Sequence, residues 1–279
     1  MNLNESCAKC IYDKQLAKYD DPEYLAEIKT ILDNRPEKIS SPEIVYKFDK
    51  IREKYFGEAE DYTDIKRSYN DLVLSMEKDL RKRISESNDP LATALVMSRI
   101  GNYIDFGAMN TVDTDIFLGL FSDTEMRDDE KKVYEGFCKE CSKAKNFLLL
   151  TDNCGEVVLD KLMLEELHKK YPKLEIKVIL RGGDVLNDAT LEDAEYVGLG
   201  ENAKLISSGV KVPGTVYSML SEEAKNAVDD ADIILSKGQG NYEAFAGEGR
   251  HAFYLFLCKC DLFINRFNVP KLTGMFVME

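Results

Sequence analysis

The second half of the chain contains a series of short apolar runs, each of which leads into a polar segment. Four of these runs cover residues 147–150, 176–180, 203–206 and 232–235, and two further candidates cover 253–257 and 275–277. A helical pattern fills the interval from about Val157 to Tyr171. Strands that alternate with helices form sheets in which the strands are largely parallel. We therefore predict an α/β fold for this half of the chain.

The first half of the chain has a helical pattern instead. At residues 21–23 and 41–43 a proline follows a capping residue and precedes an acid, as at a helix N-terminus. Residues 62–84 place apolar side chains mostly at helical spacing, and another helix begins near residue 88. The change in character near Lys145 predicts a helical domain over residues 1–144 and an α/β domain over residues 145–279.

The net charge limits the partners that this chain can bind. Its 51 acidic residues outnumber its 37 Lys and Arg residues, which gives a formal charge of −14. Binding of nucleic acid needs a clustered basic surface, which such a chain does not favour. The longest apolar stretches fall short of the ~20 residues that span a bilayer, and the N-terminus lacks a signal-peptide pattern. We expect a cytoplasmic protein that binds neither nucleic acid nor membrane.

The seven cysteines form an odd set in a chain too long to need disulfides for stability. Cys7 and Cys10, and likewise Cys138 and Cys141, have the CxxC spacing of zinc-ligand pairs. Reduced thiols on one helix face are the alternative, and we favour it because the two pairs lie far apart in the sequence.

Three other patterns carry weak functional signals. Residues 198–203 match GxGxxA, but the apolar run follows this pattern, whereas it precedes a dinucleotide-binding loop. The sequence Asp113-Thr114-Asp115 resembles the nucleophile motif of haloacid dehalogenase-like phosphatases, without the apolar strand that this motif requires upstream. Cys154 has no histidine nearby in sequence to activate it. We assign a catalytic role to none of them.

The polar segments lie where a parallel sheet binds ligands, in the crevice beyond the carboxyl ends of its strands. They read DNCGE at 152–156, RGGDVLND at 181–188, SSG at 207–209 and KGQGN at 237–241. This distribution is more informative than any one segment. It predicts a site built from several strand ends.

Two of these segments carry oxygen ligands for a hard cation. Asp152 and Asn153 follow one strand, and Asp188 follows the next. If the two strands are neighbours, the three side chains project into one crevice. Carboxylate and amide oxygens suit Mg²⁺ or Mn²⁺, which also bind a substrate phosphate. The alternative is that both aspartates cap helix N-termini.

Other residues have the chemistry to hold an anion beside that cation. Gly238 and Gly240 let the backbone approach a ligand, a helix N-terminus favours negative charge, and Lys237 adds a cation. An ordinary glycine-rich turn is the alternative. In the helical half, Asn102 and Asp105 lie three positions apart at a helix end and could reach the crevice. A solvated helix terminus explains them equally well.

Five motifs, taken together and in this order, resemble the metal-dependent damage-control phosphatases. They are GNYIDFGA (101–108), LLLTDNCGE (148–156), RGGDVLNDAT (181–190), SSG…PGT (207–215) and ILSKGQGNYE (234–243). With CAKC at residues 7–10, the chain is most similar to the stand-alone prokaryotic branch of that family. The resemblance covers essentially the whole chain.

The resemblance implies a helical domain beside a Rossmann-like mostly parallel sheet, and a divalent cation (Mg, Mn, Co or Ni) held by Asp152, Asn153 and Asp188. It implies hydrolysis of small phosphate monoesters, such as sugar phosphates or phosphopantetheine-like compounds, in metabolite damage control. Asp152 and Lys237 would be catalytic, and either water or Asp152 would attack phosphorus. The substrate-binding residues would be Asn102, Asp105, Gly238, Gly240, Asn241 and Glu243. A non-catalytic metal- or nucleotide-binding protein and a nucleotide-dependent transferase are the alternative functions.

Overall fold

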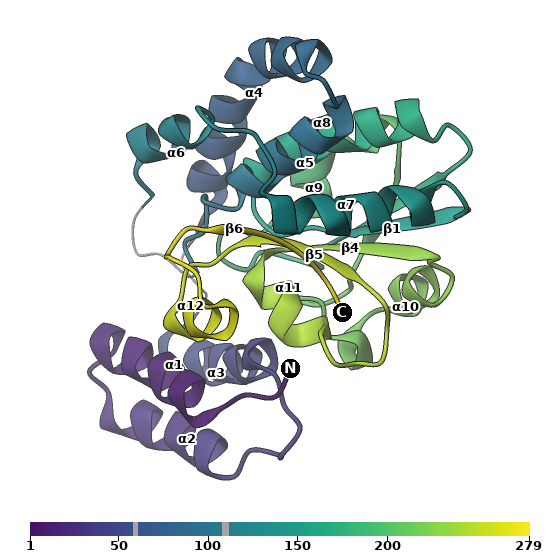
Figure 1. The fold of residues 1–279 in the computed structure, drawn as a ribbon. Coiled ribbons are helices and arrows are strands. Elements are labelled where there is room, and N and C mark those ends of the chain that lie inside the picture. The colour runs from purple at the N-terminus through teal and green to yellow at the C-terminus, as the bar shows by residue number, and fades with distance from the viewer. Residues whose placement is uncertain (58–60, 108–111) are drawn as a thin grey trace.

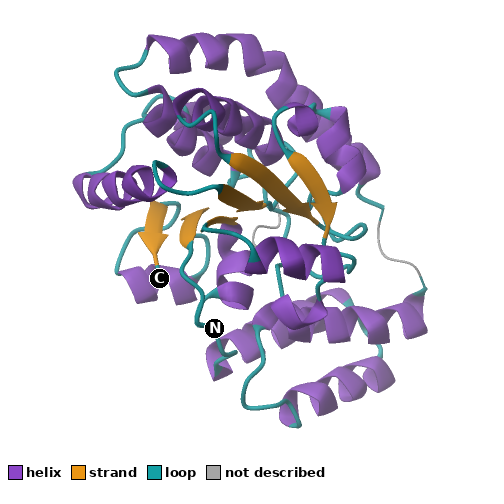
Figure 2. Cartoon of the chain, turned by 90° about the vertical axis from the view of Figure 1, so that its right-hand side faces the viewer, coloured by secondary structure: helices purple, strands orange, loops and turns teal. Residues whose placement is uncertain are grey.

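A six-stranded sheet lies at the centre of the computed structural model, which describes residues 1–57, 61–107 and 112–279. The strand order is β3-β2-β1-β4-β5-β6 (Figures 1 and 2). The first five strands in this order are mutually parallel, and β6 pairs antiparallel with β5 at one edge. This confirms the predicted α/β fold. The strands are β1 Asn146–Leu150, β2 Glu175–Leu180, β3 Lys204–Ser207, β4 Ile233–Lys237, β5 Phe253–Leu257 and β6 Gly274–Met278.

Helices precede the sheet in the chain and also connect its parallel strands. Those before β1 are α1 Glu5–Lys18, α2 Pro22–Asp33, α3 Ser41–Phe56, α4 Thr63–Glu86, α5 Pro90–Gly101, α6 Thr114–Leu120 and α7 Asp128–Cys141. Those after β1 are α8 Glu156–Lys170, α9 Leu191–Tyr196, α10 Glu222–Asp229, α11 Gly238–Phe245 and α12 Asp261–Phe267. In Figure 1, α4, α5, α7 and α8 lie on one side of the sheet, and α10, α11 and α12 lie on the other.

The strands are apolar on both faces because helices cover both. In β1, Phe147 and Leu149 join the core beneath α5, α7 and α8, whereas Leu148 and Leu150 join the core beneath α10 and α11. All four side chains are fully buried. Successive side chains of a strand point to opposite faces, so an apolar run without polar alternation is the expected sequence of such a strand.

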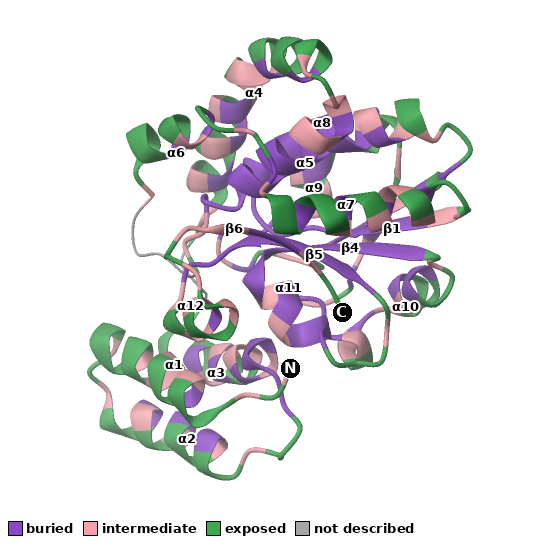
Figure 3. Ribbon diagram, in the orientation of Figure 1, coloured by how far each residue is buried: buried purple, intermediate pink, exposed green. Residues whose placement is uncertain are grey.

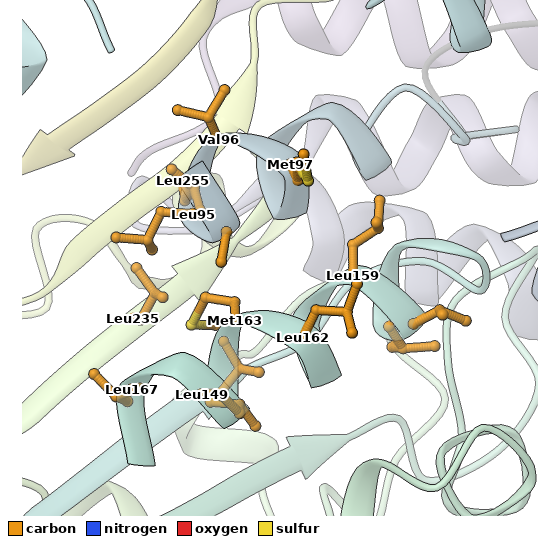
Figure 4. Packing of buried hydrophobic residues seen from close by; sticks show 14 of the residues in the cluster. Leu95, Val96, Met97, Leu149, Leu159, Leu162, Met163, Leu167, Leu235 and Leu255 are labelled. Carbon is orange, nitrogen blue, oxygen red and sulfur yellow. The ribbon is translucent and has the colours of Figure 1, made fainter. Parts of the chain in front are cut away.

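Helices α5 and α8 pack extensively against each other, directly over the central strands. Figure 4 shows Leu95 and Met97 of α5 beside Leu159 and Met163 of α8, with Leu149 of β1 below them. The same two helices are buried along most of their length in Figure 3. Gly101 permits this approach, because a Cβ there would lie 2.9 Å from Glu156 Cα and 2.9 Å from Leu159 Cδ1.

We expect Gly101→Ala to destabilise the protein by about 1–3 kcal/mol, because the added methyl group forces α5 and α8 apart. The matched control is Gly119→Ala in α6, where a Cβ would meet nothing within 4 Å. That variant should be neutral or stabilised by about 0.5–1 kcal/mol. Urea unfolding followed by circular dichroism measures both, and equal free energies of unfolding would contradict this account of the helix contact.

The first three helices have a hydrophobic core of their own. It contains Tyr24, Ile28, Ile44 and Phe48, and it is separate from the two cores that flank the sheet. Helices α4 to α7, in contrast, contribute side chains to the core between α5, α7 and α8 and the sheet. The predicted boundary between residues 144 and 145 lies just before β1, which starts at Asn146, and the main hydrophobic core extends across it. The division into two domains stays a prediction. Within the described ranges, no helix is long and apolar enough to cross a membrane.

Candidate active site

The loops that follow β1 and β2 pair with each other through their backbones. Asn153 and Asp188 form an isolated antiparallel bridge, and the Ala189 amide donates to the Asp152 carbonyl at 2.8 Å. The Cys154 amide likewise donates to the Asn187 carbonyl at 2.8 Å. Because β1 and β2 are neighbours, this pairing brings the carboxylates of Asp152 and Asp188 and the amide of Asn153 to the same strand ends. The three residues predicted to hold a cation thus lie together.

Arg181 lies between the two carboxylates and was not predicted from the sequence. Its Nε donates to Asp188 Oδ2 at 2.6 Å, and its Nη2 donates to Asp152 Oδ1 at 3.2 Å. Its Nη1 donates to Asn241 Oδ1 at 3.2 Å. The side chain is 1% exposed, so the guanidinium group is an internal counter-charge and a spacer for the two acids. The only sequence feature that indicates a place for Arg181 in the site is its position directly after the apolar strand β2.

The two aspartates lie in an environment that favours their neutral forms. Burial raises the pKa of Asp152 well above its usual value, and the nearby carboxylates of Asp188 and Glu156 raise it further. Burial also raises the pKa of Asp188, although the Arg181 guanidinium opposes this shift. A bound dication would reverse both shifts by stabilising the carboxylate forms. The electrostatics and the oxygen donors of this site therefore fit a hard divalent cation.

The end of β4 lies against the Asp152 carboxylate. Gly238 has φ +77°, and a Cβ at this position would lie 2.0 Å from Asp152 Oδ2. Asn241, one turn further along α11, donates to the Thr151 carbonyl at 2.8 Å and to the Lys237 carbonyl at 2.7 Å. Its amide is fully buried, so it joins the ends of β1 and β4. This is the point where the strand order reverses, at which doubly wound sheets bind ligands.

The helical half of the chain reaches this site through the residues after α5. Asn102 Nδ2 donates to Asp152 Oδ2 at 3.0 Å, and Asn102 Oδ1 accepts a hydrogen bond from the Leu257 amide at 3.1 Å. Asp105 forms an ion pair with Lys259, a buried residue that was not predicted from the sequence. Two of the motif residues from the helical half thus lie beside the strand ends. Ala108, the last residue of that motif, lies outside the described residues.

Two predicted site residues, Lys237 and Glu243, have partners other than the Asp152 and Asp188 carboxylates. The ammonium group of Lys237 is fully buried and contacts Glu156, Asp160 and Ser98. Glu243 accepts a hydrogen bond from Ser41 Oγ of α3 at 3.1 Å, and burial raises its pKa to about 7. Contact of either residue with a substrate stays a prediction.

The CxxC pairs do not combine into one site. Cys7 has Glu243, Cys260 and Cys10 as electrostatic neighbours, whereas Cys138 lies against Lys170 and Tyr171. All seven cysteines are free thiols. In the part of the chain that the structure describes, no three His, Cys, Asp or Glu residues are grouped to hold a metal. The Cys₄ zinc site considered from the sequence is therefore not present in this fold.

The other weak patterns have structural roles. Asp113 caps α6, where its side chain accepts a hydrogen bond from the Ile116 amide. Gly198 adopts a left-handed conformation before a short 3₁₀ turn that leads into β3. Cys154 is fully buried, and burial raises its pKa well above the usual value. A thiol in this state is a poor nucleophile.

Comparison with known proteins identifies the family. The family model described as the damage-control phosphatase ARMT1-like domain matches residues 4–273. Damage-control phosphatase PH1575 of Pyrococcus horikoshii is 29% identical over 78% of this chain and 74% of its own length. A damage-control phosphatase of Archaeoglobus fulgidus is 26% identical over 94% of this chain and 93% of its own length. The uncharacterized protein MJ0202 of Methanocaldococcus jannaschii is 31% identical over 71% of this chain and 67% of its own length.

Comparison with solved structures finds one of the same relatives, PH1575. The crystal structure of a DUF89 family protein, PH1575 from Pyrococcus horikoshii, superposes with a TM-score of 0.76 at 22% identity and covers 99% of both chains. The family match spans nearly the whole chain, including every motif that carried the resemblance. This chain belongs to the ARMT1-like damage-control phosphatase family.

Proposed function

We propose that this protein is a divalent-metal-dependent phosphatase that hydrolyses phosphate monoesters of small metabolites. The observation that carries the proposal is the convergence of Asp152, Asn153 and Asp188 at the ends of β1 and β2, next to the end of β4. Membership of the family supports it, as does similarity to two curated relatives that are named damage-control phosphatases. Sugar phosphates and phosphopantetheine-like compounds are the substrate classes that we propose to test first.

The residues of the chain divide into two sets in this proposal. Asp152, Asn153 and Asp188 hold the cation, and Arg181 keeps the two carboxylates apart and oriented. When bound, the cation supplies positive charge that stabilises the phosphoryl group in the transition state. The substrate lies beside this set and the adjoining turn at the start of α11, where Gly238 and Gly240 offer backbone amides. Further substrate-side residues are Asn102, Asp105, Asn241 and Glu243.

The environment of Asp152 favours water over this carboxylate as the nucleophile. Asp152 Oδ1 accepts a hydrogen bond from Arg181, and Asp152 Oδ2 accepts hydrogen bonds from Asn102 and Asn153. A carboxylate with both oxygens held in this way is restrained from approaching phosphorus, so we assign the attack to water. An acid-stable phosphoryl group trapped on Asp152 during turnover would contradict this assignment.

We expect the purified protein to release phosphate from a subset of small phosphomonoesters when Mg²⁺, Mn²⁺, Co²⁺ or Ni²⁺ is present. Chelation by EDTA should abolish this release, and addition of the metal should restore it, because the Arg181 guanidinium is held in ion pairs with Asp152 and Asp188 and does not replace the charge of the dication. Colorimetric phosphate assay of a substrate panel measures the effect. A metal- or nucleotide-binding protein would release no phosphate with any metal. Stabilisation by NAD or S-adenosylmethionine, without phosphate release, would indicate the transferase instead.

A further inference from the structure

A buried cluster of charged residues lies directly behind the candidate metal ligands. Lys237 ends β4, and its Nζ donates to Ser98 Oγ at 2.6 Å and to Asp160 Oδ1 at 2.5 Å, and lies 2.7 Å from Glu156 Oε1. Ser98 Oγ also donates to Asp160 Oδ1 at 2.6 Å. All four residues are fully buried. Charges are rarely buried at this depth without a role that keeps them there, because their desolvation is costly.

Glu156 connects this cluster to the candidate ligands through its two oxygens. Oε1 faces the Lys237 ammonium group, whereas Oε2 accepts hydrogen bonds from the amides of Asn102 and Asn153, each at 3.1 Å. The same two amide groups also donate to Asp152 Oδ2, at 3.0 Å from Asn102 and 2.8 Å from Asn153. Each NH₂ group therefore lies between the carboxylates of Asp152 and Glu156.

This arrangement determines which atom of each amide faces which way. A carboxylate only accepts hydrogen bonds, so the side of the amide that meets two carboxylates must be its NH₂ group. For Asn102, the carbonyl oxygen is then free to accept from the Leu257 amide, as the structure shows. For Asn153, the carbonyl oxygen takes part in neither of these hydrogen bonds, and it is the atom that can bind a cation.

We propose that Glu156, held by Lys237 and Asp160, is a positioning residue that orients the Asn153 amide and thereby sets the affinity of the site for its cation. This rests on the proposed function only in taking Asp152, Asn153 and Asp188 as the ligands. Lys237 acts through Glu156 in this scheme and does not need to touch the substrate. Outer residues that orient metal ligands in this way typically change metal affinity by 10–100-fold when they are replaced.

The test is the binding of Mn²⁺ alone, measured by electron paramagnetic resonance on the metal-free full-length protein. Glu156→Gln keeps the shape of the side chain but can turn an NH₂ group toward the asparagines, so we expect the dissociation constant for Mn²⁺ to rise about 10–100-fold. Asp160→Asn removes a charge that touches none of the three ligands. We expect it to raise the dissociation constant severalfold, because the Lys237 ammonium then loses one of its carboxylate partners.

A second buried ion pair in the same part of the fold provides the control. Arg99, the neighbour of Ser98 on α5, pairs with Glu130 of α7, and both residues are buried. Glu130→Gln should lower the melting temperature of the metal-free protein as much as Asp160→Asn does, and should leave the Mn²⁺ dissociation constant unchanged within twofold. A purely structural role for the Lys237 cluster would instead lower the melting temperature alone in all three variants.

The outcomes separate this inference from the proposed function. Mn²⁺ binding by the wild type that is weakened in Glu156→Gln and Asp160→Asn, but not in Glu130→Gln, supports the positioning role. Wild-type affinity in Glu156→Gln and Asp160→Asn overturns the positioning role and leaves the metal ligands in place. If Glu156→Gln does not fold, Asp160→Asn decides the question by the same criterion. Absence of Mn²⁺ binding by the wild type overturns both the ligand assignment and this inference.

Discussion

Replacement of Asp188 by asparagine or alanine should lower kcat/KM for the best phosphomonoester by about 10³-fold or more, which corresponds to about 4 kcal/mol of transition-state stabilisation. The change removes one of only two carboxylates in the proposed ligand set, and it leaves the Arg181 guanidinium to pair with Asp152 alone. The asparagine variant separates this effect from loss of packing, because it keeps the hydrogen-bond acceptor for Arg181 Nε. Steady-state phosphate release at saturating Mn²⁺ measures the loss.

The matched control for Asp188 is Asp115→Asn, on the exposed surface of α6. Asp115 belongs to the Asp-Thr-Asp sequence that resembles another phosphatase nucleophile motif, so this control also tests that assignment. We expect wild-type kcat/KM. Full activity in Asp188→Asn, or a loss in Asp115→Asn comparable to that expected for Asp188→Asn, would show that the active site lies elsewhere.

Gly238→Ala should be the most damaging single-methyl change near the site, with a loss of activity of about 10²-fold or more, which corresponds to about 3 kcal/mol. The new Cβ would lie 2.0 Å from Asp152 Oδ2, so the carboxylate or the turn must move. The positive φ of Gly238 adds strain of about 1 kcal/mol or more to an alanine at this position.

Gly247→Ala isolates the conformational part of this effect. Gly247 has φ +87°, but a Cβ there would meet nothing within 4 Å. Both variants should therefore lose stability through backbone strain, and Gly238→Ala alone should lose activity. Thermal melting and phosphate release, measured on the same preparations, make the comparison. Equal activities in the two variants would contradict the close approach of Asp152 to the turn.

The positions of the strand ends could be predicted from sequence because apolar runs in a parallel sheet have clear limits. Asp152 and Asp188 lie in the loops that follow β1 and β2, and the pairing of these strands and loops brings the two carboxylates together. Their use as metal ligands stays a prediction. Arg181 could not be identified in the same way, because the chain has 37 Lys and Arg residues and local pattern does not show which of them the fold encloses.

The partners of Lys237 follow from strand geometry. Its place in a glycine-rich segment predicts contact with phosphate, which stays a prediction, whereas its contacts in the structure follow from the alternation of side chains along a strand with period two. Ile233 and Leu235 belong to the core beneath α5 and α8, and Lys237 continues the same face. Its amine therefore meets Ser98 and the carboxylates of α8. Asp160, the partner of this lysine, follows the apolar residues 157–159 of α8 and is itself fully buried.

The separate core of α1 to α3 has a consequence for how sequences of this kind can diverge. This unit meets the rest of the molecule through polar contacts, such as Ser41 with Glu243 and Lys14 with the Gly107 carbonyl, and through Tyr46 of α3, which packs against Val212, Val216 and Ala244. Mutations that repack Tyr24, Ile28 or Phe48 can change its shape without disturbing the loops that carry Asp152 and Asp188. The packing inside α1 to α3 can therefore change from one related sequence to another while the strand ends that carry these two aspartates keep their arrangement.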